Sequence, residues 1–173
     1  IGMPIQDAMK LVSALTAKTG GCSLLNISPA NQDLYIHGDQ LISCTNSMDY
    51  YGHRSDVFNV FAADGKVIYV IVGYFNSETK PGDERPSVYA ALCEKYHVSP
   101  IVEKKVILEG SEYKIRSSFL DKNETMITTI AELEKQIDTS SNSEINEETK
   151  ATVAFSRQNY SEWQQDRIKK LTN

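Results

Sequence analysis

The chain has 173 residues, with 18 basic and 23 acidic side chains and a formal net charge of −5 at pH 7. A chain of this length buries roughly two-thirds of its unfolded surface, which suffices for one core or two small fused cores. The mild negative charge argues against a general nucleic-acid binder, which usually carries a basic patch. The longest strongly apolar run, 67–75, is too short to cross a bilayer as a helix. We therefore expect a globular chain with no nucleic-acid partner and no transmembrane segment in this sequence.

The chain begins at Ile1 and contains three cysteines, which are too few for a disulfide scaffold. Because the first residue is not methionine, the lack of a visible signal peptide does not indicate a cytosolic protein. Cys22 and Cys44 would form a disulfide if their segments are neighbours in an oxidising compartment. The alternative is that the cysteines, Cys93 included, are reduced thiols that pack as small hydrophobic groups.

The N-terminal segment is predicted to form an amphipathic helix. Pro4 suits its first turn, apolar residues recur at helical spacing between Ile5 and Leu15, and Gly20 and Gly21 supply a stop. The next segments are predicted to be two strands, over 33–37 and 41–45, and then a loop over 46–56.

The clearest local pattern is that of a β-hairpin. Two apolar segments, 57–62 and 67–75, flank a turn that contains Asp64 and Gly65. An Asp-Gly pair favours the positive φ angles that a tight hairpin turn requires. We therefore expect two adjacent antiparallel strands here.

The second half of the chain repeats the order of the first. A polar connection leads to a helix that starts at Pro86 and ends before Pro100, and a closing helix is predicted to be capped by Ser161 with Gln164 completing a capping box. The segment 131–137 is either a helical turn or a continuation of the preceding strand. Strands are predicted over 102–108, 112–119, 125–130 and 151–156, with a turn at 121–123 and a loop at 138–149.

Negative charge gathers in one stretch of the second half. Six acidic residues and two lysines between Ala131 and Lys150 carry four of the five net negative charges. The loop over 138–149 is therefore acidic, which is typical of a solvated surface segment and less often marks an acidic docking site. The rest of the chain is close to neutral.

The order of elements predicts an α+β fold made of two tandem units. In each unit a helix packs on one face of an antiparallel sheet, and a C-terminal helix is added to the second unit. The first unit covers 1–77, a linker covers 78–85 and the second unit covers 86–173, which includes the acidic loop. The opposite face of the sheets would form a shallow concave surface.

The repeated unit resembles a known envelope module. Gly2-Met3-Pro4-Ile5 opens a helix, and a Phe with Asp-Gly-Lys turns into Val67-Ile68-Tyr69-Val70. This is similar to the helix-plus-small-sheet module of the superfamily of β-lactamase-inhibitor-protein-like proteins and outer-membrane-assembly lipoproteins. Such proteins often carry Lys-Tyr-Gly at a helix exit, where this chain has Lys95-Tyr96-His97, so His97 is a departure. The resemblance implies an inhibitor, immunity or assembly role in the periplasm or outside the cell, and lipoprotein-like relatives.

Strong catalytic signatures are missing from the sequence. It contains no phosphate-binding glycine loop, no Gly-x-Ser-x-Gly, no His-Glu-x-x-His and no cysteine pair at zinc spacing, so no cofactor or metal is expected. Cys93 and His97 are four residues apart on the second predicted helix, which permits a small thiol-dependent enzyme as an alternative. Cys93 falls on the apolar stripe of that helix, which favours a place in the core. A structural domain of a larger envelope or secretion protein is a further alternative.

The candidate partner-binding residues are aromatic and basic, types that often anchor protein interfaces. A glycine in the loop that carries four of them allows a sharp turn that would present these side chains, while two further tyrosines are expected on strands with one open face. The six candidates are Tyr50, Tyr51, His53 and Arg54 of the loop, and Tyr35 and Tyr74 of the strands. We therefore predict a non-enzymatic module that binds another protein, of undetermined oligomeric state.

Overall fold

The computed structural model describes residues 1–16, 21–44, 49–50, 53–75, 88–97, 102–108, 111–123, 126–136 and 149–172. In this part of the chain the helices are α1 (Ile5–Thr16), α2 (Gln32–Tyr35), α3 (Val88–Tyr96) and α4 (Tyr160–Thr172). The strands of the first half are β1 (Cys22–Asn26), β2 (Gln40–Cys44), β3 (Asp49–Tyr50), β4 (His53–Arg54), β5 (Val57–Ala63) and β6 (Lys66–Phe75). Those of the second half are β7 (Val102–Leu108), β8 (Ser111–Asn123), β9 (Met126–Gln136) and β10 (Thr149–Arg157).

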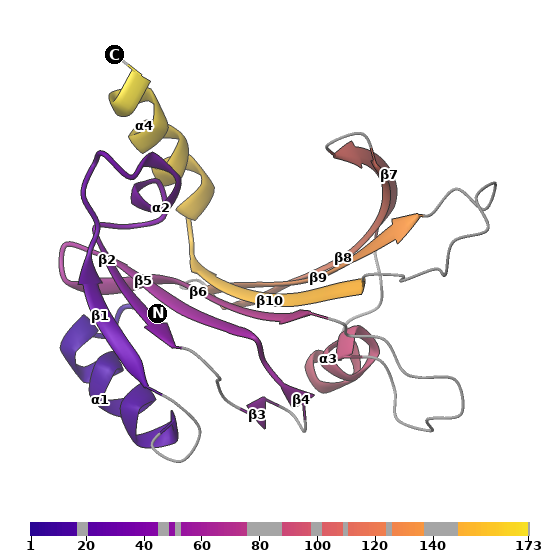
Figure 1. The fold of residues 1–173 in the computed structure, drawn as a ribbon, viewed down its shortest axis with the longest axis horizontal. Coiled ribbons are helices and arrows are strands. Elements are labelled where there is room, and N and C mark those ends of the chain that lie inside the picture. The colour runs from indigo at the N-terminus through magenta and orange to yellow at the C-terminus, as the bar shows by residue number, and fades with distance from the viewer. Residues whose placement is uncertain are drawn as a thin grey trace.

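Eight of the described strands form one antiparallel sheet in the order β1-β2-β5-β6-β10-β9-β8-β7, while β3 and β4 form a separate pair. Figure 1 shows helices on both faces of this sheet. The α+β class predicted from the sequence is therefore confirmed, together with its C-terminal helix. The strands of the two predicted units form the two halves of the sheet, which meet where β6 pairs with β10. The predicted linker, 78–85, lies outside the described residues.

The main core lies between the sheet and two helices, α1 and α3, which cover the same face. Ile5, Ala8 and Val12 recur at helical spacing along α1 and are at most 6% exposed. Val88, Tyr89 and Leu92 of α3 belong to the same buried cluster. They pack on strand residues that are almost fully buried, among them Ile42, Val72, Tyr74, Ile130, Ala151 and Val153. Each large apolar side chain buried here contributes about 1.5–3 kcal/mol relative to an exposed one.

The opposite face of the sheet is concave and carries α2 and α4 near one end (Figure 1). Leu34 and Tyr35 of α2 pack against Leu41 and Phe61 of the sheet. Further along, Tyr160 and Trp163 of α4 form a second cluster with Ala63, Ile68 and Tyr69. The C-terminal helix is thus separated from α1 and α3 by the sheet.

The predicted hairpin is confirmed as β5 and β6. Its turn residues, Asp64 and Gly65, have φ angles of 52° and 71°. The turn also fixes the start of α1, because the amide of Ile5 donates to the carbonyl oxygen of Gly65 at 2.9 Å and Pro4 bridges to Lys66. The first helix and the hairpin are therefore joined through backbone groups as well as through the core.

Two predictions about the first half are wrong. The segment 33–37 is not a strand, because Gln32–Tyr35 forms the short helix α2. The Asn31 side chain caps this helix by accepting a hydrogen bond from the amide of Leu34, so a local polar contact decides the backbone conformation. In addition, the strand β1 lies where no strand was predicted, and it pairs with β2 along its whole length.

Two details of the second half also differ from the sequence-based expectation, and one open alternative is decided. The predicted turn at 121–123 is part of β8, where a register shift between Asp121 and Asn123 absorbs the irregularity. The segment after residue 130 continues as strand β9 to Gln136, which is one of the two predicted alternatives. The capping box at Ser161 is wrong, because α4 already begins at Tyr160 after Asn159, whose φ is 59°. Apart from its final residue, which begins β10, the acidic loop lies outside the described residues.

Candidate functional site

A cluster of five rings lies between α4 and the concave face of the sheet. The ring centroids of His37 and Tyr69 are 5.5 Å apart, those of Tyr69 and Tyr160 are 4.7 Å apart, and both pairs are stacked. Phe61 lies 5.2 Å from His37, and Trp163 lies 5.9 Å from Tyr160. We call these residues, His37, Phe61, Tyr69, Tyr160 and Trp163, the aromatic cluster.

The cluster forms because three separate segments present rings to the same face. Phe61 and Tyr69 are directly opposite each other across the β5–β6 pair, next to a register shift between Phe61 and Ala62. Residues that face each other in this way interact through their side chains. His37 enters from the connection after α2, while Tyr160 and Trp163 are three residues apart and so lie on one face of α4.

His37 is the polar centre of the cluster. Its Nδ1 atom lies 2.7 Å from the Tyr160 hydroxyl oxygen and 3.1 Å from Nε2 of Gln164. The amide nitrogen of Gln164 can only donate, so this contact requires the tautomer of His37 in which Nδ1 accepts. One histidine thereby links the sheet side of the cluster to two residues of α4.

Burial determines the charge state of this cluster. It lowers the pKa of His37 below the usual value of 6.5. It raises the pKa of Tyr69, and burial together with the neighbouring Tyr69 raises that of Tyr160 well above its usual value. The three side chains are therefore predominantly uncharged at pH 7.

We expect the folded chain to lose stability through His37 as the pH falls below 6.5. Above this pH the imidazole is neutral in both states, whereas below it the unfolded chain binds the proton first, since burial depresses the pKa in the folded state. The loss continues until the pH reaches the folded-state pKa. Urea unfolding at pH 7.5 and pH 5, compared with a His37→Gln variant, isolates this contribution from the other histidines. A wild-type-minus-variant difference that is the same at both pH values would contradict it.

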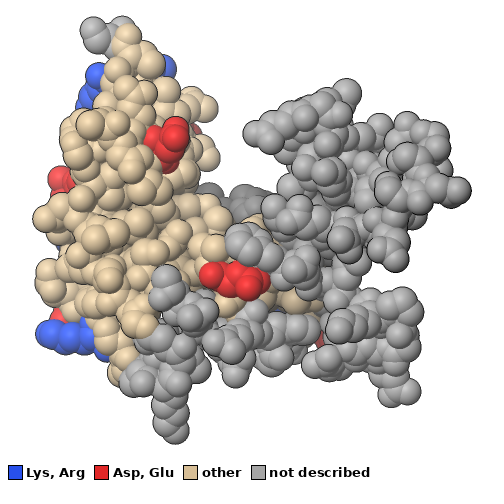
Figure 2. Space-filling model, viewed as in Figure 1, with Lys and Arg blue, Asp and Glu red and all other residues tan. Residues whose placement is uncertain are grey.

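A shallow groove of about 470 Å³ runs beside the cluster, between the sheet and the start of α4. Thr152, Ala154 and Ser156 of β10 line it together with Tyr69 and Tyr160. The lining residues of β10 alternate with residues such as Val153, which is fully buried on the other face. On the face shown in Figure 2 the described surface carries few charged side chains. The groove is therefore open and is lined by small side chains and two tyrosine rings.

Two guanidinium groups flank the outer ring of the cluster. The Cζ atoms of Arg157 and Arg167 each lie 5.1 Å from the centre of the Trp163 ring. Arg157 ends β10 and Arg167 lies on α4, so they approach the indole from different elements. Cation–π contacts of this kind hold both the ring and the cations in place.

The strand tyrosines predicted to bind a partner occupy different places. Tyr74 is 2% exposed in the core under α1 and α3, so its prediction as a surface residue is wrong; strand alternation directs it to the covered face. Tyr35 ends α2 on the concave side and packs beside the cluster under Arg167. The predicted strand at Tyr35 is wrong, because its segment is a helix, and its role as a contact residue stays a prediction.

The predicted loop residues are only partly described. Tyr50 pairs with His53 in the small β3–β4 ladder, and Arg54 follows in β4. Tyr51 lies outside the described residues. Their role as contact residues stays a prediction.

Each cysteine has a defined place. Cys22 and Cys44 form a disulfide across the β1–β2 pair, where their Cα atoms are 4.1 Å apart. Cys93 is a thiol outside any disulfide and is 7% exposed in the main core, whereas His97 is exposed just after α3 with a φ of 53°. His97 thus adopts the left-handed conformation that a glycine often takes after a helix. Among the described residues no three His, Cys, Asp or Glu side chains are placed to hold a metal ion.

The aromatic cluster was not predicted from the sequence. The predicted hairpin places Phe61 and Tyr69 on adjacent strands, but no sequence pattern brings them together with Tyr160 and Trp163. The sequence feature that points to this cluster is the hairpin, because its register places Phe61 opposite Tyr69. The contribution of His37 had no such signal, because it depends on the packing of α4, which is more than a hundred residues away in the chain.

In the described part of the chain no helix has the length and apolar character needed to cross a membrane. The features that bear on function are thus the groove, the aromatic cluster and the charged groups around Trp163. Comparisons with protein-family models, with curated proteins and with solved structures find no match for this chain.

Proposed function

We propose that this chain is a non-enzymatic protein-binding module that uses the concave face of its sheet. The observation that carries the proposal is the open groove between β10 and the start of α4, bordered by Tyr69 and Tyr160. A shallow groove on a sheet suits a loop or an extended segment of another protein, whereas sites for small molecules bury most of the ligand.

The residue types of the aromatic cluster next to the groove, and of the arginines that flank it, support the same role. Tyrosine, tryptophan and arginine dominate the binding energy of many protein interfaces. Here Tyr160, Trp163, Arg157 and Arg167 are gathered at one end of the concave face and held by mutual stacking. A surface that is already ordered loses less side-chain entropy when it binds.

The thiol-enzyme alternative has less support. Cys93 belongs to the buried cluster between α3 and the sheet, and His97 lies outside it beyond the end of the helix. A nucleophilic thiol needs access to a substrate and a base within hydrogen-bond distance. The other alternative, a structural domain of a larger envelope or secretion protein, would use the same face for assembly.

We further propose that the module acts outside the cytoplasm, as an inhibitor, immunity or assembly protein of a bacterial envelope or as a secreted protein. The Cys22–Cys44 disulfide supports this location, because such bonds persist mainly in oxidising compartments. The resemblance of the repeated helix-sheet unit to envelope modules points in the same direction.

We expect an arginine placed on the groove floor to abolish capture of the partner. Ala154→Arg introduces a long charged side chain into the groove, while Ala14→Arg makes the same change on the exposed face of α1 as a matched control. Each protein is immobilised, exposed to an envelope extract of the source organism, and its bound proteins are quantified by mass spectrometry. One protein that binds the wild type and Ala14→Arg, and binds Ala154→Arg at least about tenfold more weakly, is the expected result. Equal capture by all three would rule out the groove.

A further inference from the structure

A second cleft, separate from the groove, lies between α2 and α4. Its volume is about 430 Å³, and its lining consists of Pro29, Tyr35, Trp163, Asp166, Arg167, Lys170 and Leu171. Two aromatic rings and two apolar side chains thus surround two cations and one carboxylate. The cleft shares none of its lining residues with the groove.

Arg167 is the central group of this cleft, and its charge is incompletely compensated. Its Cζ lies 3.6 Å from the centre of the Tyr35 ring, and its Nε donates a hydrogen bond of 2.6 Å to the Tyr35 carbonyl oxygen. Its Nη2 is buried and has no hydrogen-bond partner among the described residues. A guanidinium is charged at all physiological pH values, and a partly buried charge is costly unless an opposite charge pairs with it.

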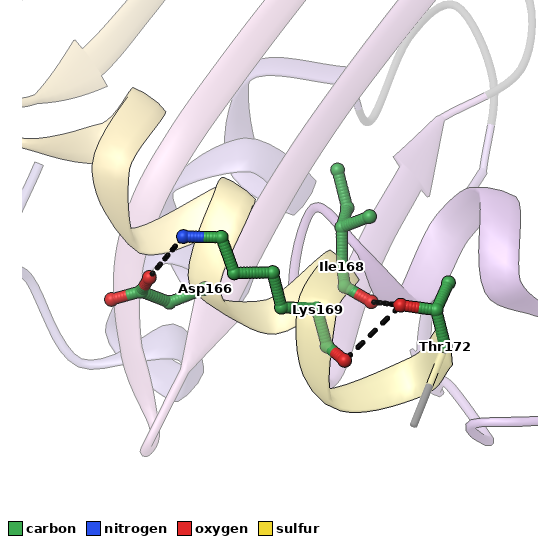
Figure 3. A network of polar contacts seen from close by, with 4 residues as sticks. All are labelled: Asp166, Ile168, Lys169 and Thr172. Atoms are coloured by element: carbon green, nitrogen blue, oxygen red, sulfur yellow. Dashed lines mark hydrogen bonds and ion pairs between the residues drawn. The ribbon is translucent and has the colours of Figure 1, made fainter.

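The carboxylate next to Arg167 does not supply that pairing. Asp166 accepts a hydrogen bond from Nζ of Lys169 at 3.5 Å on the exposed side of the helix (Figure 3). Neither of the ion pairs described within the structured part of the chain includes Arg167 or Lys170. Arg167 and Lys170 therefore outnumber the single carboxylate of the cleft, Asp166, which Lys169 also engages, so the cleft is locally positive in a chain whose net charge is −5.

We propose that this cleft binds a carboxylate of a partner protein that is flanked by an apolar side chain. Arg167 and Lys170 would hold the carboxylate, which matches the planar, forked geometry of a guanidinium. Trp163, Pro29 and Leu171 would contact the neighbouring apolar group. This inference rests on the proposed protein-binding function and adds the chemistry of one anchor to it.

The test uses a small probe, so it does not depend on knowing the partner. Trp163 is the only tryptophan of the chain, and its fluorescence and indole N–H resonance therefore report on this cleft and on the adjoining aromatic cluster. N-acetyl-phenylalanine is titrated at constant ionic strength against its neutral amide, N-acetyl-phenylalaninamide, and against inorganic phosphate. We expect saturable binding of the carboxylate at about millimolar concentration and no saturable response to the amide or to phosphate.

Three variants separate recognition from folding. Lys170→Gln removes one cation without touching the Tyr35 stack, and Arg167→Lys keeps the charge but removes the fork; we expect these to weaken binding about threefold and about tenfold. Lys169→Gln, which affects a neighbouring lysine turned to Asp166, should bind like the wild type. Thermal unfolding confirms that each variant is folded.

The outcomes distinguish this inference from the proposed function. Equal responses to the carboxylate and the amide, equal responses to phosphate and the carboxylate, or equal weakening by Lys169→Gln and Lys170→Gln would each overturn the carboxylate site. Capture of a partner that is sensitive to Ala154→Arg would leave the protein-binding function standing in all of these cases.

Discussion

Replacing Gly38 with alanine is expected to lower the free energy of unfolding by about 3 kcal/mol. A Cβ atom at this buried position would lie 2.5 Å from the carbonyl oxygen of Ala62 and 3.2 Å from its amide nitrogen. These neighbours are backbone atoms of β5, so no side chain can move aside. The connection between α2 and β2 would have to separate from the sheet, which also displaces His37 from the aromatic cluster.

The matched control for this prediction is Gly21→Ala. A Cβ at Gly21 meets nothing within 4 Å, and the residue has no positive φ. Urea unfolding of both variants should show a large loss for Gly38→Ala and a change of less than about 1 kcal/mol for Gly21→Ala. Similar unfolding midpoints for the wild type and Gly38→Ala would show that the close approach to β5 can relax.

Removing the disulfide is expected to have an effect of the same size. The bond closes a loop with a sequence separation of 22 residues, and restriction of the unfolded chain by such a loop stabilises the fold by about 3 kcal/mol. In a chain of this size that corresponds to a loss of about 9 °C in melting temperature. The double variant Cys22→Ala/Cys44→Ala, measured by thermal unfolding, gives the value.

Reductant provides the control for this second prediction. The wild type should melt lower in dithiothreitol than without it, whereas the double variant should not respond. The buried Cys93 thiol is present in both proteins, so it cannot account for a difference. An unchanged wild-type melting temperature under full reduction would contradict a stabilising role of the bond.

Local sequence patterns predicted the elements whose conformation depends on residues close together in the chain. The β5–β6 hairpin has its turn chemistry in Asp64 and Gly65, and α1 has its apolar face at helical spacing. The disulfide was one of two open possibilities, and the pairing of β1 with β2 brings its cysteines directly opposite each other. In these cases a few adjacent residues contain the deciding information.

The wrong predictions concern elements whose conformation depends on a distant segment or on a single side chain. The Asn31 cap converts an apparent strand into α2, and the first strand, β1, is defined by its pairing with β2. Gln164 was predicted to cap its own helix, but its side chain contacts His37 in the connection after α2. The candidate site follows the same rule, since its rings come from three segments that only tertiary packing unites.

The pairing of β6 with β10 resembles the interface between two identical subunits. Each of the two units consists of a helix followed by four main strands, and β6 and β10 are the last strands of their units. These two strands pair antiparallel to each other. An antiparallel pair of equivalent strands is also what a twofold axis between two identical subunits produces. The protein is thus built like a dimer whose two subunits are joined in one chain, and joining them keeps the hydrogen-bonding edges of both strands satisfied at any protein concentration.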